Sequence, residues 1–391
     1  MLKKISAFIL IIFLCMSYPI MGLAEEVQDY ESYENYEDYQ NQPEPIYIKG
    51  KVISILEDVN EVIPTSGEDM VLRIQTIRVK GITAPYKGEL FTAENVIHSD
   101  MAYNYVVRER DQVVLYLEQD EAGVVTAAYV AEPVRDRYLT YLSLVFIFLL
   151  IVIGRTKGVK AVITLALTIW SIIKILLPGI LQGYNPVLLS ILISIVITIV
   201  TLWVVSGWNR KTLTAIIGTT AGVLIAGIIA WWIGHRASLT GLNTSEAQML
   251  LYIPQGGKFD FKGILFAGII LGALGAVMDV SMSIASSLYE IKSTNPSLTQ
   301  KDLIRSGMNV GKDVMGTMSN TLILAYTGGA IHVMLLFLAY EYSLLEIMNL
   351  DMIATEIVRA LSGSIGLLCA IPLTTVVGAF LLQAKEHVSK P

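Results

Sequence analysis

The stretch that most constrains the fold is Leu271-Gly272-Ala273-Leu274-Gly275-Ala276-Val277-Met278-Asp279-Val280-Ser281-Met282-Ser283-Ile284-Ala285-Ser286-Ser287. It is an apolar run rich in small residues, and it holds one carboxylate near its middle. A charge at the centre of a membrane helix costs roughly 2.5–3.5 kcal/mol on insertion scales, and such residues normally face a bundle interior or a watery cavity. The run predicts a membrane helix, and Asp279 is the residue in it that points most directly to function.

The composition of the whole chain indicates a polytopic membrane protein. Of its 391 residues, 54% are hydrophobic and only 16% are charged, unlike a soluble globular protein. The net charge is -6, and most acids lie in the first hundred-odd residues after the leader. This acidic balance argues against nucleic acid as a partner. Cys15 lies in the leader and Cys369 in a predicted span, so the portion between leader and spans has no disulfide framework.

The N-terminus has the order of a secretory signal peptide over residues 1–24. Lys3 and Lys4 precede an apolar run from Ile5 to Ile20, and small residues follow before the first acids. The alternative is an uncleaved signal anchor, and either one places Glu25 onward outside the cytoplasm. Residues 25–45 carry eight acids, no Lys or Arg, and a tyrosine at every third position from Tyr30 to Tyr39. This composition favours a disordered tether, although the tyrosine period also suits one side of a helix or an extended ligand.

Residues 46–132 change character and predict an exported β-domain. Short, partly alternating segments such as Ile46–Ile55, Val71–Gln75 and Asp111–Leu117 are separated by Gly, Pro and Asp turns. This pattern predicts a small β-barrel or sandwich. An OB-like barrel binds ligands on its face. Without clustered aromatic or basic residues along the strands, we expect a spacer role or contact with an envelope protein.

The remaining chain, residues 138–383, is expected to form a seven-helix transmembrane domain. A hydrocarbon core of about 30 Å needs about 20 helical residues, and the spans that meet this are 138–154, 160–181, 186–207, 213–234, 263–286, 313–339 and 353–383. One set of connections carries eleven Lys and Arg residues and the alternate set three. By the positive-inside rule the first set is cytoplasmic. We therefore expect a protein of the bacterial cytoplasmic membrane, with its β-domain outside and its tail, residues 384–391, in the cytoplasm.

Asp279 lies sixteen residues after Gly263, the outer end of its span. At 1.5 Å per residue this is about 24 Å, in the inner half of the bilayer. Gly268, Gly272 and Gly275 on the same helix allow close approach of a neighbour. Asp279 suits the uptake and release of a proton or the binding of a cation. The alternative is a carboxylate that caps or cross-links helices.

The connection after this span and the start of the next are polar. Asn295-Pro296-Ser297 stops the helix, and Ser297 with Gln300 matches a capping box, so we expect a short interfacial helix near residues 297–306. In the sixth span, polar residues recur at spacings of four, four and three and form one stripe: Asn309, Asp313, Thr317 and Asn320. At a depth similar to that of Asp279, this stripe offers a proton or ion path, or else a seam of interhelical hydrogen bonds.

Three more charges lie toward the outer side of predicted spans. Lys174 is near the outer end of the second, while Glu356 and Arg359 are one to two turns into the seventh. An intramembrane Lys174–Glu356 ion pair is geometrically feasible. Alternatively, Lys174 and Arg359 extend to the interface.

Motifs of enzymes are scarce. The chain has no His-Glu-x-x-His, no metal-spaced Cys and His cluster, and no Gly-rich phosphate loop. We therefore expect a protein that is not an enzyme and that uses neither a cofactor nor a metal.

The run around Asp279 resembles the YibE/YibF family of bacterial membrane proteins. The similarity continues through Tyr289-Glu290, Asn295-Pro296, residues 306–313 and 315–326, and the exported Lys49-Gly50-Lys51-Val52 and Lys87-Gly88-Glu89. The resemblance implies the architecture but no biochemical activity. The order of Asp279, an acidic-basic connection and Gly328-Gly329 is also similar to SecD/SecF and resistance-nodulation-division transporters, in which a membrane aspartate is tied to proton-driven conformational change.

Together these features favour a transport or export protein with a coupling site at Asp279, whose partners are the lipid bilayer and a small solute or ion. The second hypothesis is a non-transporting scaffold or sensor, in which the exported β-domain binds an envelope protein. An intramembrane hydrolase ranks third, because only one aspartate lies deep in the predicted spans.

Overall fold

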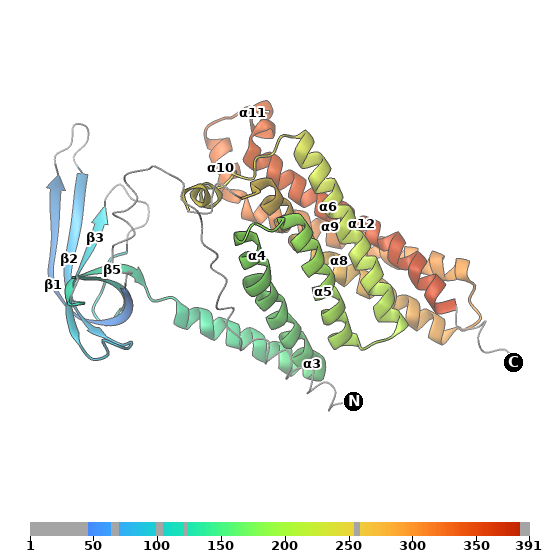
Figure 1. Cartoon of the computed structure of the whole chain (residues 1–391), viewed down its shortest axis with the longest axis horizontal. Coiled ribbons are helices and arrows are strands. Elements are labelled where there is room, and N and C mark those ends of the chain that lie inside the picture. Colours follow the sequence, from blue (N-terminus) through green and yellow to red (C-terminus); the bar gives the residue numbers. More distant parts are fainter. Residues whose placement is uncertain (1–45, 64–69, 99–104, 121–122, 254–258, 384–391) are drawn as a thin grey trace. The chain divides into compact units, whose positions relative to one another are not determined.

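The computed structural model describes residues 46–63, 70–98, 105–120, 123–253 and 259–383. The chain divides into two compact units, Met1–Thr140 and Tyr141–Pro391. The first holds a β-barrel and the second is helical (Figure 1). The expected signal peptide, the acidic tyrosine-rich segment and the C-terminal tail lie outside the described residues and stay predictions.

The first unit contains a closed five-stranded barrel. Its strands are β1 (Ile46–Ile63), β2 (Met70–Gly81), β3 (Leu90–His98), β4 (Gln112–Gln119) and β5 (Val125–Pro133). They follow the order β1-β2-β3-β5-β4, and β3 pairs with β5 in parallel while the other pairs are antiparallel. This is a small barrel of the OB-like kind, so the expectation of a small β-domain is confirmed.

The period-two pattern of the strands explains which side chains fill the barrel. Val113, Leu115 and Leu117 alternate along β4 and are buried, and Ile77 and Val79 do the same on β2. The segment predicted at Val71–Gln75 is part of a longer strand, β2. The strand β3 was not predicted, because its inward positions include the polar residue Asn95.

A buried hydrogen-bond network joins β2 and β3 to the segment before β4. The Gln75 amide donates to the Val107 carbonyl at 3.3 Å, and its Oε1 accepts from the Val107 N–H at 2.9 Å. Asn95 donates to Gln75 Oε1 at 3.0 Å and to the Tyr105 carbonyl at 2.8 Å. A buried polar group left unpaired costs about 1–3 kcal/mol. Because moving the segment before β4 would break these hydrogen bonds, the network holds that segment in place.

Acid should weaken the barrel through Asp58. The Arg73 guanidinium donates two 2.8 Å hydrogen bonds to this carboxylate and Gln75 donates a third, which lowers its pKa from 3.8 to about 2. Stability from this lowered pKa is present above pH 3.8 and is lost as the pH falls toward 2. We expect Arg73→Gln to have a lower free energy of unfolding than wild type at pH 7. This difference in free energy should shrink as the pH falls from 3.8 to about 2. Denaturant unfolding of the full-length protein, followed by circular dichroism, measures it; a gap independent of pH contradicts the prediction.

The second unit consists of helices. They are α3 (Asp136–Ser171), the π-helical turn η1 (Ile172–Leu176), α4 (Leu177–Leu181), α5 (Pro186–Ser206), α6 (Arg210–Arg236), α7 (Ser245–Met249), the 3₁₀ turn η2 (Leu250–Tyr252), α8 (Phe261–Thr294), α9 (Gln300–Gly329), α10 (Ile331–Ala339), α11 (Leu344–Asn349) and α12 (Asp351–Gln383). Side chains cap several starts: Asn185 bonds the Leu188 N–H and Asn209 the Thr212 N–H, as N-caps do.

Among the described residues, five helices are long and apolar enough to cross a membrane, or six if one bent pair counts as a span. Two expected spans fall in Asp136–Leu181, which is interrupted at Arg155 (φ 48°, ψ −126°). A Cβ on Gly158 would lie 1.9 Å from the Leu150 carbonyl oxygen, so the chain folds back there. The sixth expected span is the pair α9 and α10, bent by 60°. The several apolar helices fit a polytopic membrane protein, and the count of seven stays a prediction.

Helices α6, α8 and α12 pack against one another at the centre of this unit. Their contact depends on small residues: a Cβ on Gly222 would lie 2.7 Å from the Ala370 Cβ, and one on Gly366 would lie 2.6 Å from the Ala226 Cβ. In a membrane, such close approach supplies the van der Waals contact that holds helices together. This packing sets the position of α8, which carries Asp279.

The start of α9 differs from the expectation. Thr299 and Asp302, rather than Ser297 and Gln300, form the capping box, while the Ser297 hydroxyl bonds Asn295 Oδ1 at 2.6 Å. The segment expected as a separate short helix is the first part of the 30-residue helix α9. No proline lies between Thr299 and Gly329, so the helix continues.

Candidate functional site

Asp279 lies on an exposed face of α8. Gly268, Gly272, Gly275 and Asp279 are all exposed, whereas Val277 and Val280 beside them are buried in the core. A Cβ at Gly268 or Gly275 would meet no atom within 4 Å. Within the described ranges, the Asp279 side chain has no hydrogen-bond or ion-pair partner. An ionised carboxylate facing hydrocarbon is costly, so in a membrane this face would need water, a cation or another chain against it.

The packing register between α8 and α9 sets which residues share the level of Asp279. A Cβ on Gly272 would lie 2.8 Å from Tyr326 Oη, and one on Gly311 would lie 3.6 Å from Ile284 Cδ1. Because the two helices run antiparallel, interpolation between these contacts puts Asp279 about level with Thr317.

The four residues of the polar stripe stay on one helix face. Asn309, Asp313, Thr317 and Asn320 are exposed, whereas the buried positions of α9 are Leu303, Gly307, Gly311 and Leu322. The stripe is thus outside the contact that α9 makes with α8 and α12. The Thr317 hydroxyl donates within its own helix, to the Val314 carbonyl at 3.0 Å. Thr317 of the stripe is about level with Asp279, but no hydrogen bond joins the stripe and Asp279 in the described residues.

The three charges that were expected toward the outer side show a Glu356–Arg359 pair and not the expected Lys174–Glu356 pair. Glu356 accepts a hydrogen bond from Arg359, one turn along α12, and both side chains are about three-quarters buried, at 25% and 29% exposure. Lys174 is exposed in the π-helical turn η1 and has no recorded partner among the described residues. The local i,i+3 spacing explains the pairing, because residues three apart on a helix are neighbours.

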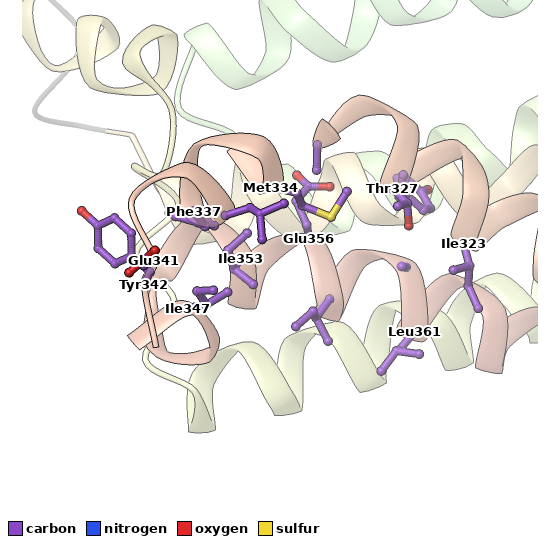
Figure 2. A pocket seen from close by; sticks show the side chains of 15 residues that line it. Ile323, Thr327, Met334, Phe337, Glu341, Tyr342, Ile347, Ile353, Glu356 and Leu361 are labelled. Atoms are coloured by element: carbon purple, nitrogen blue, oxygen red, sulfur yellow. The ribbon is translucent and has the colours of Figure 1, made fainter. Parts of the chain in front are cut away.

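A cavity of about 660 Å³ lies between α9, α10, α11 and α12. Figure 2 shows its lining, which is mainly apolar, including Ile323, Met334, Phe337, Ile353 and Leu361. Its polar groups are Tyr326, Thr327, Glu341, Tyr342 and Glu356. Ligand sites typically have this size, apolar walls and a few polar groups.

Tyr326 connects this cavity with the face of α8 that carries Asp279. Tyr326 lines the cavity, and its hydroxyl lies against Gly272. A movement of α8 against α9 would therefore change the cavity wall.

Sequence reasoning did not identify the cavity or the buried hydroxyl groups of α12. Thr355, Ser364, Thr374 and Thr375 are buried, and their hydroxyl oxygens have no hydrogen-bond partner among the described residues. The only sequence signal for the cavity is the Gly328-Gly329 pair, where the α9–α10 bend begins. In the same described ranges, no three His, Cys, Asp or Glu side chains are placed to hold a metal ion.

The apolar helices and the attached barrel fit an integral membrane protein with a small β-domain. Residues 142–384 match the model of the YibE/F-like protein family, and residues 46–132 match that of the YibE/F family N-terminal domain. The chain therefore belongs to the YibE/F family, and the resemblance seen in the sequence is confirmed. No curated protein and no solved structure matches it.

Proposed function

We propose that this protein moves a small solute or ion across the bacterial cytoplasmic membrane, and that Asp279 couples this movement to a proton or cation. The observation that carries the proposal is the position of Asp279: a carboxylate within an apolar helix, on an open glycine-lined face, without a partner in the described residues. A residue whose only role was to cross-link helices would have a partner in the bundle.

The chemistry of the proposal follows from the two states of the carboxyl group. Ionised, Asp279 favours water or a cation beside α8; protonated, it is far less costly against hydrocarbon. Binding or release of a proton would therefore alter which neighbour the face of α8 prefers. Tyr326 lies against that face and lines the cavity, which gives a physical route from Asp279 to the cavity wall.

The cavity is proposed as the solute site, and filling it should stop transport. We expect Ala360→Phe, which places a ring in the cavity lining, to reduce solute movement by at least tenfold while the protein remains folded. Ile365→Phe is the matched control, because Ile365 lies on the same helix, is 38% exposed and does not line the cavity. Uptake into vesicles of the solute found by comparing knockout and complemented cells is the measurement. Equal uptake by the two variants would show that the cavity is not the solute site.

A second candidate function is a non-transporting scaffold or sensor. It is favoured by the barrel, which is a compact unit with its own buried core. In that case deletion of residues 46–132 destroys function and Asp279→Asn has little effect. If Asp279→Asn destroys function and the deletion is mild, transport is favoured instead. Complementation of a knockout strain with each variant distinguishes the two.

A further inference from the structure

Strand pairing gathers lysines that are far apart in the sequence. Lys51 on β1 and Lys80 on β2 are directly opposite each other in the antiparallel register. Lys87, in the turn before β3, lines the same surface cavity of about 490 Å³. The remaining lining residues are Ile53, Gly81, Ile82 and Gly88, and no carboxylate is among them.

This lysine cavity, defined by Lys51, Lys80 and Lys87, is electrostatically unfavourable by itself. Like charges directly opposite one another destabilise a strand pair. None of the three side chains has a hydrogen bond or ion pair with a described residue. Elsewhere on the barrel, cations do pair: Arg73 with Asp58, and Lys49 with Asp136. An anion in the cavity would relieve the repulsion.

The ion pair of Lys49 locates the cavity relative to the start of the first apolar helix. Lys49 and Lys51 are two residues apart on β1 and lie on the same side of the strand, about 7 Å from each other. Asp136, the partner of Lys49, is the first residue of α3, which is long and apolar enough to cross a membrane. Only two residues separate the end of β5 from α3. The lysine cavity therefore includes a residue two positions along β1 from the one that pairs with the first residue of α3.

The apolar residues at the cavity favour a lipid over a free ion. Ile53 and Ile82 line it beside the lysines and are 47% and 37% exposed. Leu90, paired with Lys80, is 58% exposed. Protein surfaces that bind the headgroup and acyl-chain boundary of a bilayer typically combine cationic side chains with exposed apolar ones.

We propose that the lysine cavity binds the phosphate of an anionic phospholipid headgroup and so holds the barrel on the membrane surface. Each lysine near an anionic membrane contributes about fivefold in binding, so the three contribute about a hundredfold. This inference stands independently of transport, because it uses only residues of the first unit and the start of α3.

The test uses the full-length protein in nanodiscs. Leu90→Cys, with Cys15 and Cys369 replaced by serine, carries a fluorophore, and lipids with a nitroxide on the headgroup quench it when the barrel docks. We expect strong quenching with phosphatidylglycerol, weak quenching with phosphatidylcholine alone, and reversal by salt. Combined Lys51→Gln, Lys80→Gln and Lys87→Gln should weaken docking about a hundredfold, while the triple change to Arg retains it.

A matched control lies on the same strand. Arg78 is exposed on the same side of β2 as Lys80 but does not line the cavity, so Arg78→Gln should leave docking close to wild type whereas Lys80→Gln weakens it about fivefold. Equal quenching in the two lipids, or unchanged docking of the triple glutamine variant, would overturn the proposal. A third result would also overturn it: no quenching in either lipid, while inorganic phosphate stabilises the wild-type protein but not the triple glutamine variant. That result would assign the cavity to free phosphate.

Discussion

Asp279→Asn is expected to reduce function to the level of a knockout while the protein still inserts and accumulates normally. Asparagine has nearly the same size and remains polar, but it can neither release a proton nor carry the charge that holds a cation. Asp279 is exposed on α8 and has no hydrogen-bond or ion-pair partner among the described residues, so its replacement removes neither kind of interaction from the fold. Loss of function would therefore report on the carboxylate and not on folding.

The measurement is a comparison of solutes and ions accumulated by knockout cells carrying the wild-type gene, Asp279→Asn or a control. Ser283→Ala is a suitable control, because Ser283 is exposed one turn further along α8. Immunoblots of the membrane fraction check that all three proteins reach equal levels. Full activity of Asp279→Asn would end the coupling hypothesis, and equal loss in Ser283→Ala would show that the face is sensitive for another reason.

Gly222→Leu is expected to cause a large loss of stability in the helical unit. A Cβ at this position would lie 2.7 Å from both the Ala370 Cβ and the Val277 Cγ1, and 2.9 Å from the Gly366 carbonyl oxygen. A backbone atom cannot move aside as a flexible side-chain end can, so α6 and α12 must separate. Overpacking of a well-packed core typically costs about 1–3 kcal/mol, and this site is expected to reach at least the upper end.

Thermal unfolding of the purified protein in detergent tests this expectation. The matched control is Gly275→Leu on α8, where an added Cβ meets nothing within 4 Å. We expect a lowered melting temperature only for Gly222→Leu. The close packing of α6 and α12 would be refuted if both variants melted at the wild-type temperature.

Much of the architecture could be predicted from the residues because local patterns decide it. Apolar runs long enough to cross a bilayer define α5, α6, α8 and α12, and alternation defines most barrel strands. The strand β3 was not predicted, because its inward Asn95 is satisfied by Gln75 and the Tyr105 carbonyl. Such partners come from other strands, so no local pattern reveals them.

The candidate site was predictable only in part. Asp279 and the stripe on α9 follow from the cost of polar groups in an apolar helix. That Asp279 is about level with Thr317 follows from the packing register between α8 and α9, which the sequence does not give. The pairing of Glu356 with Arg359 was not predicted, since both Arg359 and Lys174 were within reach on sequence spacing alone.

Local sequence patterns predict a membrane protein with a small β-domain, a resemblance to the YibE/F family, and an acid, Asp279, within an apolar helix. These properties depend on composition and on periods of two and 3.6 residues, which are local. No local pattern indicates that Lys51, Lys80 and Lys87 share one cavity, that Tyr326 lies against Gly272, or that an apolar cavity forms beside Glu356; the folded chain shows all three. Each depends on contacts between residues distant in the chain, which strand register and helix packing create.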